Sequence, residues 1–263
     1  RGLTYVYWTP ILFRNTILLD DRTVVIINII VDFRMDNEIR NSLLAMGFEL
    51  YDSYDQSLLY EGLRGHVDLS IFFDGQTFVC SKESYDYYRQ LLSDHISGKY
   101  RLVQGVKNLE KKYPGDVALN LAYTGSYAIG RLDSLEPRLI ELIGRRGDLK
   151  IISVNQGYAN CSICQVTDGA VITGDPGLSK TLRGRGLEVL EISPGHIGLD
   201  GMDYGFIGGA SCDLGQERVG FFGDLASHPD GESIRSFIEE HGKEAISLGS
   251  GRLRDYGSGI VFW

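Results

Sequence analysis

The sequence predicts an α/β fold in which five similar units close into a five-bladed propeller within one domain, residues 1–263. Strand-like apolar runs recur about every 45 residues, a spacing typical of propellers and stacked repeats. After each run we expect a turn, a second strand, an amphipathic helix and a short closing strand. The expected units lie near residues 23–65, 66–116, 117–155, 156–205 and 206–250, and a last strand, 257–263, remains.

Turn residues and helix ends place the elements of the first three units. Gly47 stands where a left-handed residue ends many helices, and Asp74-Gly75 is a strong hairpin dipeptide because both residues tolerate positive φ. The expected elements are the strand Thr23–Phe33, the helix Asp36–Met46 and the strand Phe48–Tyr51; the strands Leu69–Phe73 and Thr77–Cys80 and the helix Lys82–Leu92; and the strands Val117–Tyr123 and Tyr127–Gly130, the helix Ser134–Ile143 and the strand Leu149–Val154.

The fourth unit has the clearest signals, because Asp175-Pro176 is a helix start and Thr167-Asp168-Gly169 a turn. A first unit without a leading strand and an unassigned C-terminal strand predict that the two ends of the chain pair and hide sheet edges. The remaining expected elements are the strands Cys161–Val166 and Ala170–Thr173, the helix Asp175–Leu182 and the strand Leu187–Ile192; and a Gly-rich approach from Phe206, the strand Arg218–Phe222, the helix Glu232–His241 and the strand Ala245–Leu248.

Composition narrows the functional classes. The chain has 43% hydrophobic and 23% charged residues, which is ordinary globular usage, and a net charge of −9 that disfavours nonspecific nucleic-acid binding. The longest apolar run, residues 23–31, is far shorter than the roughly 20 residues of a membrane span. Four irregularly spaced cysteines indicate a reducing, cytoplasmic location. We expect no membrane contact, no metal and no cofactor, and the oligomeric state stays open.

Three stretches carry a resemblance to a known fold: residues 154–162 (VNQGYANCS), residues 205–211 (GFIGGAS) and Phe222-Gly223-Asp224. They resemble an uncharacterised bacterial family of the pentein, or guanidino-group-modifying enzyme, fold. That fold is a five-bladed α/β propeller shared by arginine and agmatine deiminases, dimethylarginine hydrolases and amidinotransferases. A ribosome anti-association factor has the same fold and is not an enzyme. The resemblance covers most of the chain from about His66 onward and implies a fold, because that family carries no firm activity.

The resemblance to pentein enzymes implies a Cys nucleophile, a His near an acidic residue, and carboxylates that hold the guanidinium in a central channel. The segment 208–212 (GGASC) resembles the deiminase Gly-Gly-x-x-Cys, which makes Cys212 the candidate nucleophile. The order of the units in those enzymes instead implies a nucleophile near Ser258. It also implies that the deiminase His-x-Asp motif falls on residues 211–213, of which only Asp213 matches the motif. His66 and Asp68 reproduce His-x-Asp before an early leading strand, where a two-residue spacing puts both side chains on one side.

Other polar residues have both a functional and a structural interpretation. Asn120, Asn155 and Asn160 stand where units begin, and either contact a ligand or form turns. Cys161-x-x-Cys164 lacks the second ligand pair of a zinc site, and strand alternation places Cys161 near the channel and Cys164 in the packing. The other histidines fit loops and helix ends: His95, His196, His228 and His241.

Two functional hypotheses follow. One is a non-catalytic protein that binds a small polar or guanidino ligand in the channel without the complete deiminase set. The other is a hydrolase or amidinotransferase-like enzyme that acts on a guanidino or amidino compound through a cysteine. In either case the expected site groups the catalytic candidates with further ligand-binding candidates: His66, Asp68, Asn120, Asn160, Cys161, Ser211, Cys212, Asp213 and Ser258.

Overall fold

The computed structural model of the chain describes residues 15–19, 22–32, 35–53, 71–73, 77–81, 85–92, 101–106, 121–124, 126–132, 137–145, 150–154, 158–195, 205–215, 217–255 and 260–262. Among them are five mixed sheets with one common pattern. In each sheet a leading strand pairs antiparallel with a middle strand, which pairs in parallel with a third strand.

The five sheets follow one another along the chain, except that the first takes its leading strand from the C-terminus. Leading, middle and third strands are β16 (Ile260–Phe262), β2 (Arg22–Asp32) and β3 (Phe48–Ser53); β4 (Ile71–Phe73), β5 (Thr77–Ser81) and β6 (Arg101–Val106); β7 (Leu121–Tyr123), β8 (Tyr127–Gly130) and β9 (Lys150–Ser153); β10 (Cys164–Gln165), β11 (Ala170–Thr173) and β12 (Glu188–Glu191); and β13 (Ser211–Gly215), β14 (Arg218–Phe221) and β15 (Glu244–Ser247). The pairing of β16 with β2 is the predicted contact between the chain ends.

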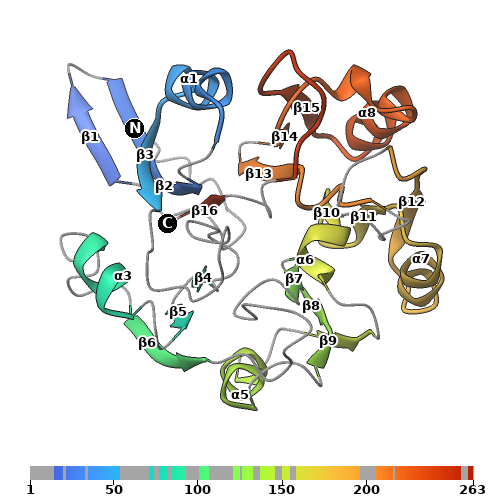
Figure 1. Ribbon diagram of the computed structural model, residues 1–263, viewed down its shortest axis with the longest axis horizontal. Helices are drawn as coiled ribbons and strands as arrows, with labels where there is room; N and C mark the ends of the chain where they lie inside the picture. The colour runs from blue at the N-terminus through green and yellow to red at the C-terminus, as the bar shows by residue number, and fades with distance from the viewer. Residues whose placement is uncertain are drawn as a thin grey trace, which may run out of the picture.

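A helix joins the middle strand to the third strand in each unit. These helices are α1 (Asn37–Ala45), α3 (Tyr85–Leu91), α5 (Pro137–Gly144), α7 (Pro176–Arg183) and α8 (Gly231–Glu240). They lie on the outside of the molecule, and the leading strands lie toward its middle (Figure 1). Asp175 caps α7 as predicted, because its Oδ1 accepts hydrogen bonds from the backbone N–H groups of Gly177 and Leu178 at 2.8 and 3.0 Å.

Three elements differ from the sequence expectation. The strand predicted from Cys161 is wrong over its first part, because residues 159–162 form the short helix α6 (Ala159–Ser162) and β10 begins only at Cys164. Two strands were not predicted: β1 (Asn15–Leu19), which pairs with the first half of β2, and β6. Gly47 does adopt the expected left-handed conformation, with φ 87°. The predicted turn at Asp74-Gly75 lies outside the described residues.

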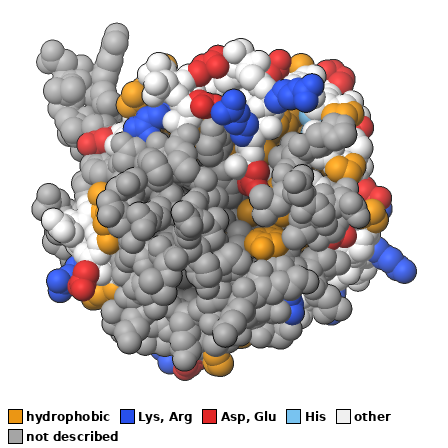
Figure 2. Space-filling view, viewed as in Figure 1, with side chains coloured by type: hydrophobic (Ala, Val, Ile, Leu, Met, Phe, Trp, Pro, Cys, Tyr) orange, Lys and Arg blue, Asp and Glu red, His pale blue; other side chains and the backbone are white. Residues whose placement is uncertain are grey.

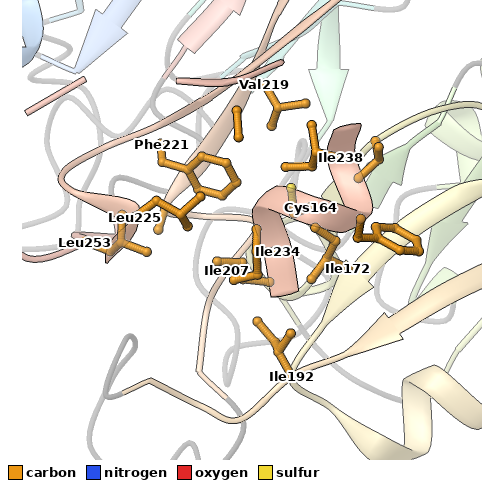
Figure 3. Close-up of a cluster of buried hydrophobic side chains, with 14 of the residues drawn as sticks. Cys164, Ile172, Ile192, Ile207, Val219, Phe221, Leu225, Ile234, Ile238 and Leu253 are labelled. Carbon is orange, nitrogen blue, oxygen red and sulfur yellow. The ribbon is translucent and has the colours of Figure 1, made fainter. Parts of the chain in front are cut away.

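Buried apolar side chains join neighbouring units. The largest cluster joins the fourth and fifth units and includes Ile172, Phe221 and Ile234 (Figure 3). A second joins the third and fourth units through Ile129, Ile163 and Leu178, among others. A third packs Ile39 and Leu43 of α1 against Cys212, Leu214, Phe222 and Leu248 of the fifth unit. Each fully buried large side chain contributes about 1.5–3 kcal/mol to folding, so these clusters hold successive units together.

Strand direction brings the loops of each unit to one edge of its sheet. The middle and third strands are parallel, so their carboxyl ends share an edge, and the antiparallel leading strand begins there. In the fifth unit Ser211, at the start of β13, pairs with Phe221, at the end of β14. In the fourth, Cys164 at the start of β10 pairs with Ile172 near the end of β11. In the fourth and fifth units the segment before the leading strand therefore lies at the same edge as the loops that follow the parallel strands, where open α/β sheets bind ligands.

The surface facing the viewer in Figure 2 carries both signs of charge. Lys and Arg side chains alternate with Asp and Glu along its upper rim, and no continuous basic patch is visible among the coloured residues. Of the helices that the structure describes, none is long and apolar enough to cross a membrane.

Candidate functional site

The candidate site begins where the fourth and fifth units meet at the loop edge. The backbone N–H of Gly209 donates to the carbonyl of Cys161 in α6 at 2.9 Å, and the N–H of Ser211 donates to the carbonyl of Gly208 at 3.2 Å. A Cβ on Gly208 would overlap the carbonyl oxygens of Asn160 and Ile163. Glycine is therefore required at position 208 for the two loops to approach this closely.

The carboxylate of Asp255, from a distant part of the sequence, also lies at this contact between the fourth and fifth units, which we call the junction. Asp255 lies five residues before β16, and a Cβ on Gly209 would overlap its Oδ1. The carboxylate thus rests directly against the backbone of the Gly208-Gly209 turn. Asp255 is half-buried, so solvent screens its charge less than it would screen an exposed carboxylate. Segments that precede the leading strands of three units, the fourth, fifth and first, therefore meet here.

Tyr158 enters the junction in a strained conformation. It has φ 59° and ψ 38°, the left-handed region that bulky residues rarely adopt. Its ring packs against Phe206 with the ring centroids 5.7 Å apart. Strain of this kind costs on the order of 1–3 kcal/mol and concentrates at functional sites. The strained residue starts α6 and so sets the position of Asn160 and Cys161.

Two buried thiols, those of Cys164 and Cys212, lie in the leading strands that follow these segments. Burial raises the pKa of Cys164 from 9.0 to about 11, opposed by a hydrogen bond with the Ser211 side chain and by the charge of Lys243. Burial, and then the charges of Asp213 and Cys164, raise the pKa of Cys212 well above its ordinary value. Both environments favour the neutral thiol, whereas a nucleophilic cysteine acts as its thiolate. Cys161 is also buried, in the same apolar cluster as Cys164, and it lies in α6, so the strand alternation expected for these two residues does not apply.

The contacts of the Asp213 carboxylate lie toward the hairpin end of β13, opposite to the loop edge. Its Oδ1 accepts a hydrogen bond from the N–H of Gly215 at 2.9 Å, and its Oδ2 lies 3.6 Å from the Nζ of Lys243. Both partners are near the β13–β14 hairpin turn, away from the loop edge. The carboxylate therefore stabilises the hairpin end of the fifth unit and is a less suitable ligand contact than Asp255.

The raised pKa of Cys164 predicts a loss of stability at high pH. The unfolded chain releases this proton near pH 9 and the folded protein near pH 11, so the thiol's contribution is complete below pH 9 and is lost as the pH rises through that range. Between pH 8.5 and 10.5 the wild type should lose about 2 kcal/mol more unfolding free energy than Cys164→Ala, measured by urea denaturation. The cavity in the variant lowers its stability equally at both pH values, so the cavity does not contribute to the difference between the two pH values. Equal losses would contradict this assignment.

The described histidines have structural contacts. The Nδ1 of His228 accepts a hydrogen bond from the N–H of Asp230 at 3.0 Å, and burial lowers its pKa below 6.5. His241 lies at the end of α8, with its Nδ1 2.7 Å from the carbonyl of Phe237 and its Nε2 3.2 Å from Glu188. His66, His95 and His196 lie outside the described residues. Within the described part of the chain, no group of three or more His, Cys, Asp or Glu side chains could hold a metal ion.

The structure places the predicted site residues unevenly. Asn160, Cys161 and Ser211 come together at the loop edge, and Cys212 follows in β13. Sequence reasoning missed Asp255 and Tyr158: nothing distinguishes Asp255 from the other 34 acidic residues, and a backbone conformation such as that of Tyr158 has no simple sequence signal. The other candidates lie outside the described residues: His66, Asp68, Asn120, Asn155 and Ser258.

Comparison with protein families gives one match. Residues 30–260 match the model of a family of unknown function, DUF6873. No curated protein matches the sequence.

Solved structures share the fold at low sequence identity. SxtG, an amidinotransferase from Microseira wollei in the saxitoxin biosynthetic pathway, is 13% identical with a TM-score of 0.57, over 85% of this chain and 77% of that one. Dimethylarginine dimethylaminohydrolase from Pseudomonas aeruginosa, complexed with citrulline, is 10% identical with a TM-score of 0.55, over 90% and 98%. Agmatine deiminase from C. jejuni is 9% identical with a TM-score of 0.53, over 89% and 91%. The fold is therefore that of the guanidino-group-modifying enzymes.

Proposed function

This chain belongs to the family of unknown function DUF6873 and has the fold of guanidino-group-modifying enzymes, and we propose that it binds a small guanidino or amidino cation without transforming it. The ligand lies in the middle of a closed, single-domain five-bladed propeller, at the loop edge of its sheets. The half-buried Asp255 carboxylate against Gly209 is the observation that carries the proposal.

The chemistry of the junction suits a planar cation. A carboxylate accepts two parallel hydrogen bonds from a guanidinium or amidinium, the strong bidentate arrangement. Asp255 places such a carboxylate against the backbone of Gly209, where segments of the fourth, fifth and first units meet. Asn160, Cys161, Ser211 and Ser258 belong to the proposed wall of the site, with His66, Asp68 and Asn120 from the second and third units.

The state of Cys212 supports binding without a covalent step. Attack on a guanidinium carbon requires a thiolate beside the ligand. Burial and the charge of Asp213 raise the pKa of Cys212, so at neutral pH the neutral thiol predominates. Its side chain packs in the cluster that joins α1 to the fifth unit. We therefore assign Cys212 to packing in this proposal.

Calorimetric titration beside a turnover assay tests the proposal. The wild type should bind at least one of agmatine, arginine and dimethylarginine, with no ureido product and no released amine. Cys212→Ser and the matched control Cys164→Ser, which replaces another buried thiol of the fourth and fifth units, should bind equally well.

Two results would overturn this account in different ways. Turnover that Cys212→Ser abolishes and Cys164→Ser retains would establish an enzyme of hydrolase or amidinotransferase type with Cys212 as nucleophile. If the folded wild type bound none of the three compounds, the proposal of a guanidino ligand would be wrong.

A further inference from the structure

We propose that Glu38, on the outer helix α1, is a positioning residue for the Asp255 carboxylate; this inference rests on the proposed function. Asp255 lies in a stretch whose described residues, 248–255, form no helix or strand; we call these residues the closing segment. The segment follows β15 and leads toward β16. Because it has no regular backbone ladder of its own, its path depends on contacts from both sides.

On one side the fifth unit holds the closing segment through its backbone. The N–H of Asp224 donates to the carbonyl of Gly251 at 2.6 Å, and the N–H of Arg254 donates to the carbonyl of Phe222 at 3.0 Å. The N–H of Leu253 donates to the Oγ of Ser227 at 3.2 Å. Gly223, with φ 135°, lets these two stretches of backbone approach. These bonds fix the side of the segment that faces the fifth unit.

On the other side α1 holds the segment through side chains. Both oxygens of Glu38 bind one residue: Oε1 accepts from the N–H of Ser250 at 3.0 Å, and Oε2 accepts from its Oγ at 3.2 Å. The Oγ of Ser42, one turn further along α1, donates to the carbonyl of Leu248 at 2.9 Å. Ile39 and Leu43, which follow Glu38 and Ser42 directly in α1, pack in the same cluster as Leu248.

Glu38 is the decisive contact among these because it fixes orientation. Two acceptors on one carboxylate engage two donors of one residue, which sets both the place and the direction of the chain at Ser250. The ion pair between Arg254 and Asp36 at 2.8 Å also joins α1 to the segment, but it is a single contact between half-exposed side chains, and such pairs contribute little. Glu38 and Ser250 are exposed as well, so their effect comes from the two paired hydrogen bonds and not from burial. Asp36 therefore provides a matched control on the same helix end.

The experiment compares Glu38→Ala, Glu38→Gln and Asp36→Asn with the wild type in two measurements. One is the carboxyl-carbon NMR resonance of Asp255 without ligand, and the other is the affinity for agmatine by calorimetry. Glu38→Ala should move the resonance and weaken agmatine binding about tenfold, since small misplacements of a binding group are costly. Glu38→Gln should restore both values, because its amide oxygen and nitrogen can still pair with the N–H and hydroxyl of Ser250. Asp36→Asn should change neither.

Each of the other possible results contradicts one part of the proposal. An unmoved Asp255 resonance in Glu38→Ala overturns the positioning role, whatever the ligand data show. A moved resonance with unchanged agmatine affinity overturns the link between Glu38 and binding. If the wild type binds none of agmatine, arginine and dimethylarginine, the proposed ligand fails, and the resonance alone decides whether Glu38 positions Asp255.

Discussion

A Gly208→Ala variant should lose about 3 kcal/mol of unfolding free energy, the upper part of the range for overpacked sites. The added methyl group would overlap the carbonyl oxygens of Asn160 and Ile163, which are backbone atoms at the two ends of α6 and cannot rotate away. Relief requires α6 to move from the Gly208-Gly209 turn, which breaks the hydrogen bond from Gly209 to Cys161. Urea denaturation of the purified variant measures the loss.

Two other alanine variants serve as comparisons. Gly209→Ala meets the Asp255 side chain, which can turn aside, so it should lose less stability than Gly208→Ala and still weaken agmatine binding. Gly169→Ala has nothing within 4 Å of the new methyl group and should stay within about 0.5 kcal/mol of the wild type. Equal stability of all three variants would show that α6 and the turn are not in close contact.

The second large effect concerns charge. Asp255→Asn keeps the size of the side chain but removes the negative charge and replaces one acceptor with a donor. Hydrogen bonds to charged groups contribute about 1.5–3 kcal/mol, so agmatine affinity should fall on the order of 30-fold. Calorimetric titration at one ionic strength measures the change.

A matched control separates this effect from the overall charge of the protein. Glu239→Gln removes one negative charge from the exposed side of α8 and should leave agmatine affinity within about twofold, because exposed distant charges are screened. If Asp255→Asn weakened binding no more than Glu239→Gln, Asp255 would not contact the ligand.

The sequence was most informative where local chemistry determines an element. Asp175-Pro176 predicts the start of α7 because a cap and a preset φ act within a few residues, and Gly47 predicts the left-handed end of α1. The start of the fourth unit was not predictable in this way. Residues 161–166 have a strand-like pattern, but residues 159–162 form α6, which begins at the left-handed Tyr158; the ring of Tyr158 packs against Phe206, a contact between distant residues.

The candidate site was predictable in its location but only partly in its chemistry. Unit order placed Asn160, Cys161 and Ser211 near the starts of leading strands, where the structure has them. Residue type suggested Asp213, whose carboxylate faces Lys243 at the other end of the strand. Asp255 was missed because its position depends on the closing segment, which the fifth unit and α1 hold from opposite sides. Such long-range contacts leave no periodic pattern in the sequence.

A crystal structure of the wild type with agmatine at saturating concentration tests the central claim most directly. The account predicts a guanidinium nitrogen about 2.7–3.2 Å from a carboxylate oxygen of Asp255, beside the Gly208-Gly209 turn and with Cys212 unmodified. Agmatine bound elsewhere, or bound with its guanidinium carbon attached to a cysteine sulfur, would contradict it.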